Sequence, residues 1–226
     1  MSFMKNSLVV LLVLYFTACA LQTNDKSSEK SEKFAFSFSE KYIGLEKNRT
    51  FQWLGIPYAQ APVGSLRWKA PRSLENENDQ VKAIEFSNPC PQVESISIDK
   101  KGEGEFLGSE DCLFLNIFAP KNISSDKKLP VMFWIHGGGN TSGEAGSYDF
   151  SKLAAAHDLV IVSINYRLGF LGWFYHPSFA ATSNDQGDKS GNFGTLDQIM
   201  ALKWVRKNIE DFGGDKNNVT IFGESA

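Results

Sequence analysis

Residues 212–226 form the stretch Phe212-Gly-Gly-Asp-Lys-Asn-Asn-Val-Thr-Ile-Phe-Gly-Glu-Ser-Ala226. Its residues 219–222 are a short apolar run with β-branched side chains, which is typical of a buried strand. The run leads directly into Gly223-Glu-Ser-Ala226, which matches the first four positions of the pattern G-x-S-x-G. This pattern places a serine on a sharp strand-to-helix turn, where small flanking residues allow close packing and the hydroxyl stands clear of the sheet. Ser225 is therefore the candidate nucleophile.

The composition indicates one globular domain. The chain has 226 residues, of which 42% are hydrophobic, with 18 Phe and 5 Trp. Such a chain can bury a sizeable core and is too rich in aromatic residues to be disordered beyond its amino terminus. The net charge of −3 is spread without a long run of like charge, which argues against a nucleic-acid partner.

Residues 1–20 have the composition of an export signal, with Lys5 before an apolar segment that is too short to span a bilayer. Ala18-Cys-Ala20 fits a signal-peptidase site. Phe16-Thr-Ala-Cys19 resembles a bacterial lipobox, although Leu is usual at the position of Phe16. The polar spacer 21–33 suits a tether, so the sequence favours a membrane-anchored lipoprotein acylated on Cys19. A secreted protein is the alternative, and either way the folded domain is expected over residues 34–226.

Two cysteines, Cys90 and Cys112, remain besides Cys19. In an exported protein an isolated pair favours a disulfide, here closing a loop of about 23 residues. Two buried free thiols are the alternative.

The apolar pattern predicts an α/β fold. Residues 131–135 and 159–164 are continuous apolar runs on either side of a helix expected at 148–157, a pattern typical of parallel strands covered on both faces. Further strands are expected at residues 34–39, 50–58 and 113–118, and residues 170–192 are expected to be irregular. A last helix should begin at a capping box of Thr195 and Gln198 and end at Gly213-Gly214. Its expected apolar face comprises Leu196, Ile199, Met200, Trp204, Val205 and Ile209.

The glycine run His136-Gly-Gly-Gly139 follows the strand at 131–135. Glycines leave backbone N–H groups accessible, so such a run can bind a phosphate or stabilise an oxyanion. The phosphate-binding patterns G-x-x-x-x-G-K-[ST] and G-x-G-x-x-G are both missing here. Because an elbow serine follows in the same chain, the oxyanion interpretation is favoured.

With these two motifs, the chain resembles the amino-terminal part of a type-B carboxylesterase, the α/β-hydrolase family that includes the cholinesterases. The resemblance covers residues 34–226, and several motifs in the family's order make it specific. They are Gly55-Ile-Pro-Tyr-Ala59 with Pro62-Val-Gly64 and Leu66-Arg67, Glu110-Asp-Cys-Leu-Phe-Leu-Asn116, His136-Gly-Gly-Gly139, Asn165-Tyr-Arg-Leu-Gly169, Gly191-Asn-Phe-Gly194, Phe212-Gly-Gly-Asp215 and Gly223-Glu-Ser-Ala226.

The resemblance implies an incomplete α/β-hydrolase fold, with the amino-terminal portion of a mixed, mostly parallel sheet up to the nucleophile elbow. It implies Ser225 as nucleophile, an oxyanion hole from the backbone N–H groups of Gly138, Gly139 and Ala226, and Glu224 in the pocket beside the serine. It matches Cys90 and Cys112 to the family's first disulfide. The implied reaction is ester hydrolysis through an acyl-enzyme, on a small-molecule ester and without a cofactor.

The chain departs from the family at Asn140, where an aromatic or apolar residue is usual, so the shape of the acyl pocket is not carried over. Asn140 also begins a glycosylation sequon, as do Asn48, Asn122 and Asn218. A glycan at Asn140 would obstruct the site. The sequons are interpreted as coincidence in an Asn-rich chain, consistent with a bacterial source.

None of the three histidines is expected to be the catalytic base. In this fold the order along the chain is nucleophile, acid, histidine, so the base should follow Ser225. His136 is expected to shape the glycine loop, His157 to lie at a helix end, and His176 to lie in a loop. Asp111 is expected to be a structural carboxylate beside Cys112. No metal-binding motif such as H-E-x-x-H occurs.

Three functions therefore compete. The first is an exported serine carboxylesterase. The second is a non-catalytic adhesion or binding protein on the same fold, as in the neuroligin-like branch, against which the presence of Ser225 counts. The third is an inactive truncated gene product, because the triad acid and histidine are expected after Ala226. The 226 residues alone are expected to be inactive and prone to aggregate, since the elbow strand would be an exposed sheet edge.

Overall fold

The computed structural model describes residues 33–38, 40–75, 79–93 and 104–226. The expected signal at 1–20, Cys19 and all of the spacer except Lys33 lie outside these residues, so those expectations stay predictions. Within the described residues, no helix combines the length and apolar character needed to cross a bilayer.

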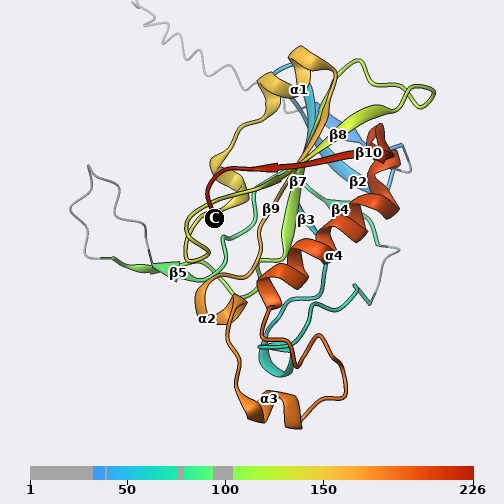
Figure 1. Ribbon diagram of the computed structural model, residues 1–226. Coiled ribbons are helices and arrows are strands. Elements are labelled where there is room, and N and C mark those ends of the chain that lie inside the picture. Colours follow the sequence, from blue (N-terminus) through green and yellow to red (C-terminus); the bar gives the residue numbers. More distant parts are fainter. Residues whose placement is uncertain (1–32, 39, 76–78, 94–103) are drawn as a thin grey trace, which may run out of the picture. The chain divides into compact units, whose positions relative to one another are not determined.

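The described strands form one mixed sheet and a small separate ribbon (Figure 1). The sheet runs in the order β1-β2-β3-β7-β9-β8-β10, and β4 pairs with β2. Pairing is antiparallel from β1 to β9 and parallel from β9 through β8 to β10. The ribbon joins β5 to β6. The strands are β1 (Lys33–Phe36), β2 (Tyr42–Lys47), β3 (Thr50–Pro57), β4 (Val81–Lys82), β5 (Gln92–Val93), β6 (Phe106–Leu107), β7 (Phe114–Pro120), β8 (Leu129–Ile135), β9 (Val160–Ile164) and β10 (Gly214–Gly223).

Helices cover both faces of this sheet, as the apolar pattern predicts. Helix α1 (Ser151–His157) connects the parallel strands β8 and β9, and every residue of β9 is buried. The α1 face of the sheet contributes Leu54, Phe118 and Ile161 to a small cluster around Ala154 of the helix. On the opposite face lies α4 (Phe193–Asn208), so the central strands β7 and β9 are covered on both faces.

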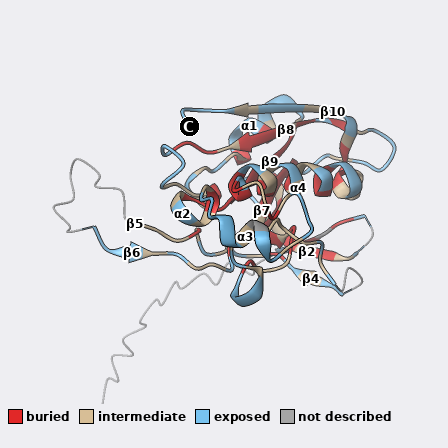
Figure 2. Ribbon diagram, turned by 60° about the horizontal axis from the view of Figure 1, so that its bottom comes forward, coloured by how far each residue is buried: buried red, intermediate tan, exposed pale blue. Residues whose placement is uncertain are grey.

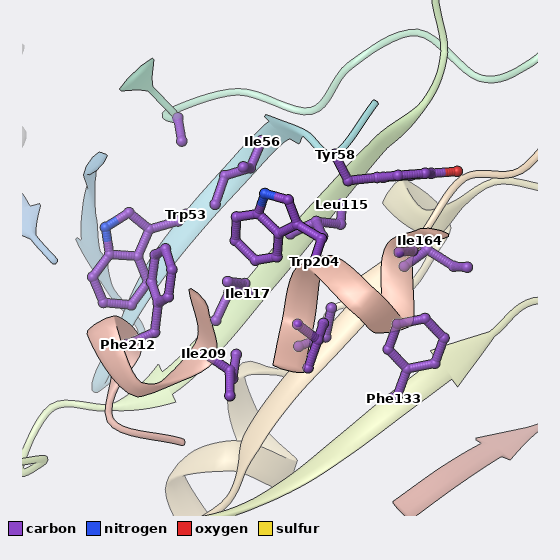
Figure 3. Packing of buried hydrophobic residues seen from close by; sticks show 14 of the residues in the cluster. Trp53, Ile56, Tyr58, Leu115, Ile117, Phe133, Ile164, Trp204, Ile209 and Phe212 are labelled. Atoms are coloured by element: carbon purple, nitrogen blue, oxygen red, sulfur yellow. The ribbon is translucent and has the colours of Figure 1, made fainter. Parts of the chain in front are cut away.

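The larger core lies between the sheet and α4 (Figure 3). Trp204 of the helix packs near Phe212, which in turn makes an edge contact with Trp53 of β3 at a ring-centroid distance of 4.9 Å. Phe212 ends the 3-10 helix η3 (Ile209–Phe212), and Gly213 then turns the chain with a φ of 81°. The core thus fixes the point at which β10 begins and leads toward Ser225. Figure 2 shows buried residues on the sheet-facing side of α4 and mostly exposed residues along β10.

Two local predictions for the middle of the chain differ from the structure. Helix α1 begins at Ser151 rather than at residue 148, because the Asp149 carboxylate accepts the Ser151 N–H at 2.9 Å and a separate 3-10 helix, η2 (Ala145–Ser147), precedes it. The stretch expected to be irregular contains the short helices α2 (Gly169–Gly172) and α3 (Pro177–Ala181). A further 3-10 turn, η1 (Gly64–Leu66), lies earlier in the chain.

The predicted capping box of α4 is wrong. The helix begins at Phe193, two residues before Thr195, and the Thr195 hydroxyl accepts the indole N–H of Trp173 at 3.2 Å. The predicted apolar face is also shifted, since Ile199 is 42% exposed whereas Asp197 is fully buried. Asp197 is buried because it is paired with Arg167, a contact that an apolar periodicity cannot reveal.

Candidate active site

The site is built where the carboxyl ends of β8 and β10 lie side by side. The two strands are parallel, with Gly223 in register with Ile135, so the segments that follow them emerge together. Two glycines make this closeness possible. A Cβ on Gly223 would lie 2.7 Å from the carbonyl oxygen of Ile135, and one on Gly137 would lie 2.5 Å from the carbonyl oxygen of Glu224. Any side chain at either position would push the two segments apart.

Ser225 follows β10 on a turn that an L-residue rarely adopts. Its φ is 59°, in the left-handed region, and the residue is exposed. A non-glycine residue in this region stores strain of roughly 1–3 kcal/mol, which persists only where the surroundings enforce it. This is the conformation expected for a serine raised on a strand-to-helix elbow.

The glycine run forms a tight turn opposite Ser225. Gly138 has a φ of 112° and Gly139 a φ of 63°. The carbonyl oxygen of Gly138 accepts the backbone N–H groups of Thr141 and Ser142, both at 3.1 Å. The N–H of Asn140 donates to the carbonyl oxygen of Ala226 at 3.1 Å, which ties the turn directly to the residue after the serine.

These contacts fix the direction of two backbone N–H groups. The Gly139 N–H belongs to the same planar peptide unit as the Gly138 carbonyl, which Thr141 and Ser142 hold. Likewise, the Gly138 N–H shares a plane with the Gly137 carbonyl, to which Nδ1 of His136 is hydrogen-bonded at 2.8 Å. Among the described residues, no acceptor takes the N–H of Gly138 or Gly139. Both groups are therefore held in place and available.

His136 is a buried polar side chain of the site. It is 2% exposed and stacks on Tyr166 at a centroid distance of 4.4 Å, and the Tyr166 hydroxyl donates to its carbonyl oxygen. Burial lowers the pKa of its imidazole below the ordinary 6.5, and the bond to the Gly137 carbonyl opposes this shift. Since a carbonyl oxygen only accepts, Nδ1 carries the proton of the neutral ring. Nε2 is buried without a partner in the described part of the chain.

A hollow of about 460 Å³ lies over the end of β10. Its lining combines apolar and polar groups, namely Ile135, His136, Asn140, Tyr166, Gln198, Ile221, Phe222, Gly223, Ser225 and Ala226. Gly138, Gly139 and Glu224 do not line it. The side chain of Glu224 instead lies near Gly137, since a Cβ there would be 3.2 Å from its Oε2.

The other residues singled out in the sequence lie outside this hollow. The predicted disulfide is confirmed, because Cys90 and Cys112 are joined with a Cα–Cα distance of 5.0 Å. Asp111 is exposed beside it. His157 ends α1, and His176 precedes α3 with its ring nitrogen accepting the Ser178 N–H at 3.2 Å. The described residues contain no group of three or more His, Cys, Asp or Glu side chains arranged to hold a metal ion.

Sequence reasoning missed Tyr166 and the Arg167–Asp197 pair. Arg167 is 3% exposed at its side chain and contacts the Asp197 carboxylate through Nε and Nη2 at 2.8 and 2.7 Å. Tyr166 and Arg167 both belong to the motif at residues 165–169. The motif indicates where they lie in the chain but does not reveal which residues they contact. The pair holds α4 against the segment that follows β9, and Tyr166 then supports His136 from that segment.

Comparison with known proteins agrees with this geometry. Residues 40–226 match the sequence profile of the carboxylesterase family. The chain is 47% identical to the para-nitrobenzyl esterase of Bacillus subtilis (strain 168) over 189 residues, which cover 82% of this chain and 37% of that protein. It is 36% identical to liver carboxylesterase B-1 of Rattus norvegicus over 225 residues, covering 96% of this chain and 39% of that protein.

Solved structures show the same likeness. A structure of PNB esterase matches with a TM-score of 0.70 at 44% identity, covering 85% of this chain and 38% of that one. A carboxylesterase of Geobacillus stearothermophilus matches with a TM-score of 0.66 at 36% identity, covering 80% of this chain and 36% of that one. The chain thus spans about two fifths of the length of these relatives. It belongs to the carboxylesterase family and has the amino-terminal part of the α/β-hydrolase fold.

Proposed function

We propose that the protein is a carboxylic ester hydrolase in which Ser225 is the nucleophile. The observation that carries the proposal is the left-handed turn at Ser225 directly beside the glycine turn, in which the N–H groups of Gly138 and Gly139 are held without an acceptor among the described residues. A raised serine beside backbone N–H donors without an acceptor is the arrangement that acyl transfer uses.

The reaction has two steps. The Ser225 hydroxyl oxygen attacks the ester carbonyl while its proton passes to a histidine, which the family order places after Ser225 in the chain. The N–H groups of Gly138, Gly139 and Ala226 stabilise the tetrahedral oxyanion, each such donor contributing about 3 kcal/mol to lowering the barrier. The alcohol leaves with the proton, and water then hydrolyses the acyl-enzyme by the same route.

The hollow over Ser225 supports a small-molecule ester as substrate. Phe222 and Ile221 supply apolar surface, while Asn140 and Gln198 supply polar groups from the glycine turn and from α4. Glu224 is proposed to shape the pocket through its contact with Gly137 rather than by facing the hollow.

The proposal is tested with the complete gene product that carries these residues, assayed on p-nitrophenyl acetate. Ser225→Ala should lower kcat/KM by roughly 10³-fold or more, because the covalent step is lost. Ser65→Ala is the matched control. Ser65 is an exposed serine that is distant from Ser225 in the sequence, so this variant should keep full activity. Unchanged hydrolysis by Ser225→Ala would refute the assignment.

We also propose that the protein is exported and tethered to a membrane through acylated Cys19, which the lipobox-like sequence before the polar spacer supports. Cells that express the protein should incorporate labelled palmitate into it, and Cys19→Ala should abolish the label and release the protein from the membrane fraction. Cleavage at residue 20 with no label in the wild-type protein would instead identify a secreted form.

A further inference from the structure

The side-chain amide of Gln92 forms two hydrogen bonds with Gly143, which lies just beyond the glycine turn. Its Oε1 accepts the backbone N–H of Gly143 at 2.8 Å, and its Nε2 donates to the carbonyl oxygen of Gly143 at 2.9 Å. The same Nε2 also donates to the carbonyl oxygen of Cys90 at 3.0 Å. One side-chain amide therefore satisfies both backbone groups of Gly143, in the manner of a strand neighbour.

Gly143 is pressed against the peptide that orients the Gly138 N–H. Its φ is 109°, and a Cβ there would lie 2.5 Å from the carbonyl oxygen of Gly137 and would overlap Nδ1 of His136. The Gly137 carbonyl and His136 Nδ1 are the two groups whose hydrogen bond sets the plane of the 137–138 peptide. A displacement of Gly143 would therefore be transmitted to the oxyanion donor.

Gln92 itself is held by two independent supports. It lies two residues after Cys90, whose disulfide to Cys112 fixes this part of the chain. It is also the first residue of β5, where it pairs with Leu107 of β6. The amide thus links the glycine turn to a cross-linked segment 51 residues earlier in the sequence.

We propose that Gln92 is a positioning residue of the active site, which holds Gly143 and thereby keeps the Gly138 N–H aligned with the developing oxyanion. This inference rests on the proposed ester hydrolysis, and Gln92 does not line the hollow over Ser225. Because the oxyanion forms only after attack on the carbonyl and is not present in the bound ester, loss of the contact acts on kcat and leaves KM nearly unchanged.

The contact itself is tested by hydrogen–deuterium exchange on the complete gene product, a measurement that needs no substrate. In Gln92→Met, which keeps the size but loses both hydrogen-bonding groups, the Gly143 amide should exchange roughly tenfold faster or more, while amides of β8 are unaffected. Gln80→Met is the control, since Gln80 Nε2 also donates to a backbone carbonyl, that of Glu40 at 3.0 Å. Equal exchange at Gly143 in the wild type and Gln92→Met overturns the proposal.

The catalytic effect is tested in the complete gene product, normalised to active sites by the first-turnover burst. Gln92→Met should lower kcat roughly tenfold with KM within about twofold, and Gln80→Met should change neither. Gln92→Glu keeps an acceptor for the Gly143 N–H but brings a carboxylate against two carbonyl oxygens, so it should be at least as slow as Gln92→Met. A lower melting temperature with unchanged kcat would show a merely structural role. A wild-type protein without esterase activity would refute the proposed function, while the exchange experiment would still decide the contact.

Discussion

Nδ1 of His136 lies 2.8 Å from the carbonyl oxygen of Gly137, so a buried imidazole fixes the peptide that presents the Gly138 N–H. The ring is enclosed by Tyr166 on one face and has no second partner among the described residues. Burial holds the pKa of this imidazole below its ordinary value of 6.5. A group that is critical to the turn is therefore one that the fold stabilises in its neutral form.

The first prediction concerns the pH dependence of stability. With a pKa lowered in the folded state, the unfolded chain binds more protons at His136 as the pH falls below 6.5. The stability contribution of the neutral ring is therefore full above that pH and is lost as the pH falls toward the folded-state pKa. We expect the melting temperature to fall as the pH drops below about 6.5, and to fall less in His136→Gln.

Melting curves on the complete gene product check this expectation, with His157→Gln as the control. His157 is an exposed histidine at the end of α1, away from the glycine turn, so its replacement is a matched control for the loss of one imidazole. If His136→Gln retained the wild-type slope of melting temperature against pH, the acid sensitivity would have to come from other groups.

A second prediction compares two neighbouring glycines. A Cβ on Gly138 would overlap the carbonyl oxygen of Ser142, whereas one on Gly139 would meet only Thr141 Oγ1 at 3.8 Å. Gly138→Ala should therefore displace the turn and lower kcat by about 10²-fold, the effect of losing one oxyanion donor. Gly139→Ala should cost only the left-handed conformation, roughly 1 kcal/mol of stability, with a much smaller loss of kcat. Esterase kinetics and urea unfolding of both variants measure the contrast, and equal losses of kcat would contradict it.

A third prediction concerns the buried ion pair behind the site. Replacing Arg167 by Met leaves the Asp197 carboxylate, which is fully buried, without its counter-charge and should cost roughly 3–5 kcal/mol of unfolding free energy. Arg67→Met removes the partner of Glu110 from a pair whose side chains are 43% and 25% exposed, so solvent screens the pair and the loss of stability should be far smaller. The double change Arg167→Met with Asp197→Leu should recover part of the loss in urea titrations. A double variant as unstable as Arg167→Met would show that shape, not charge, dominates.

The sequence predicts those parts of the fold that local signals encode. An apolar run marks both strands, with β8 followed by His136 and the glycine run and β10 ending at Gly223, and the structure places these two strands side by side. The left-handed turn at Ser225 lies where the elbow pattern puts it. The Cys90–Cys112 disulfide is likewise confirmed. It could be predicted because an isolated pair of cysteines leaves few alternative pairings.

The parts that were missed depend on polar contacts between distant segments. Asp197 meets Arg167 across 30 residues, and Gln92 meets Gly143 across 51. A hydrophobic pattern treats a charged residue in a helix as exposed, so it predicted Ile199 inside and could not place Asp197 there. Such contacts form only when the fold brings distant segments together, so they cannot be predicted from residue spacing.

The last prediction concerns the free edge of β10. In the described residues this strand ends the strand order and pairs only with β8, and Ile221 on it is 55% exposed. An exposed apolar edge recruits other chains, so a recombinant chain of residues 21–226 should scatter light within hours at micromolar concentration and hydrolyse no ester. Ile221→Lys should suppress the scattering because a charge on an edge strand opposes pairing, whereas Val63→Lys, which adds the same charge at an exposed loop position, should not. Soluble, esterase-active protein from residues 21–226 would contradict both parts of this prediction.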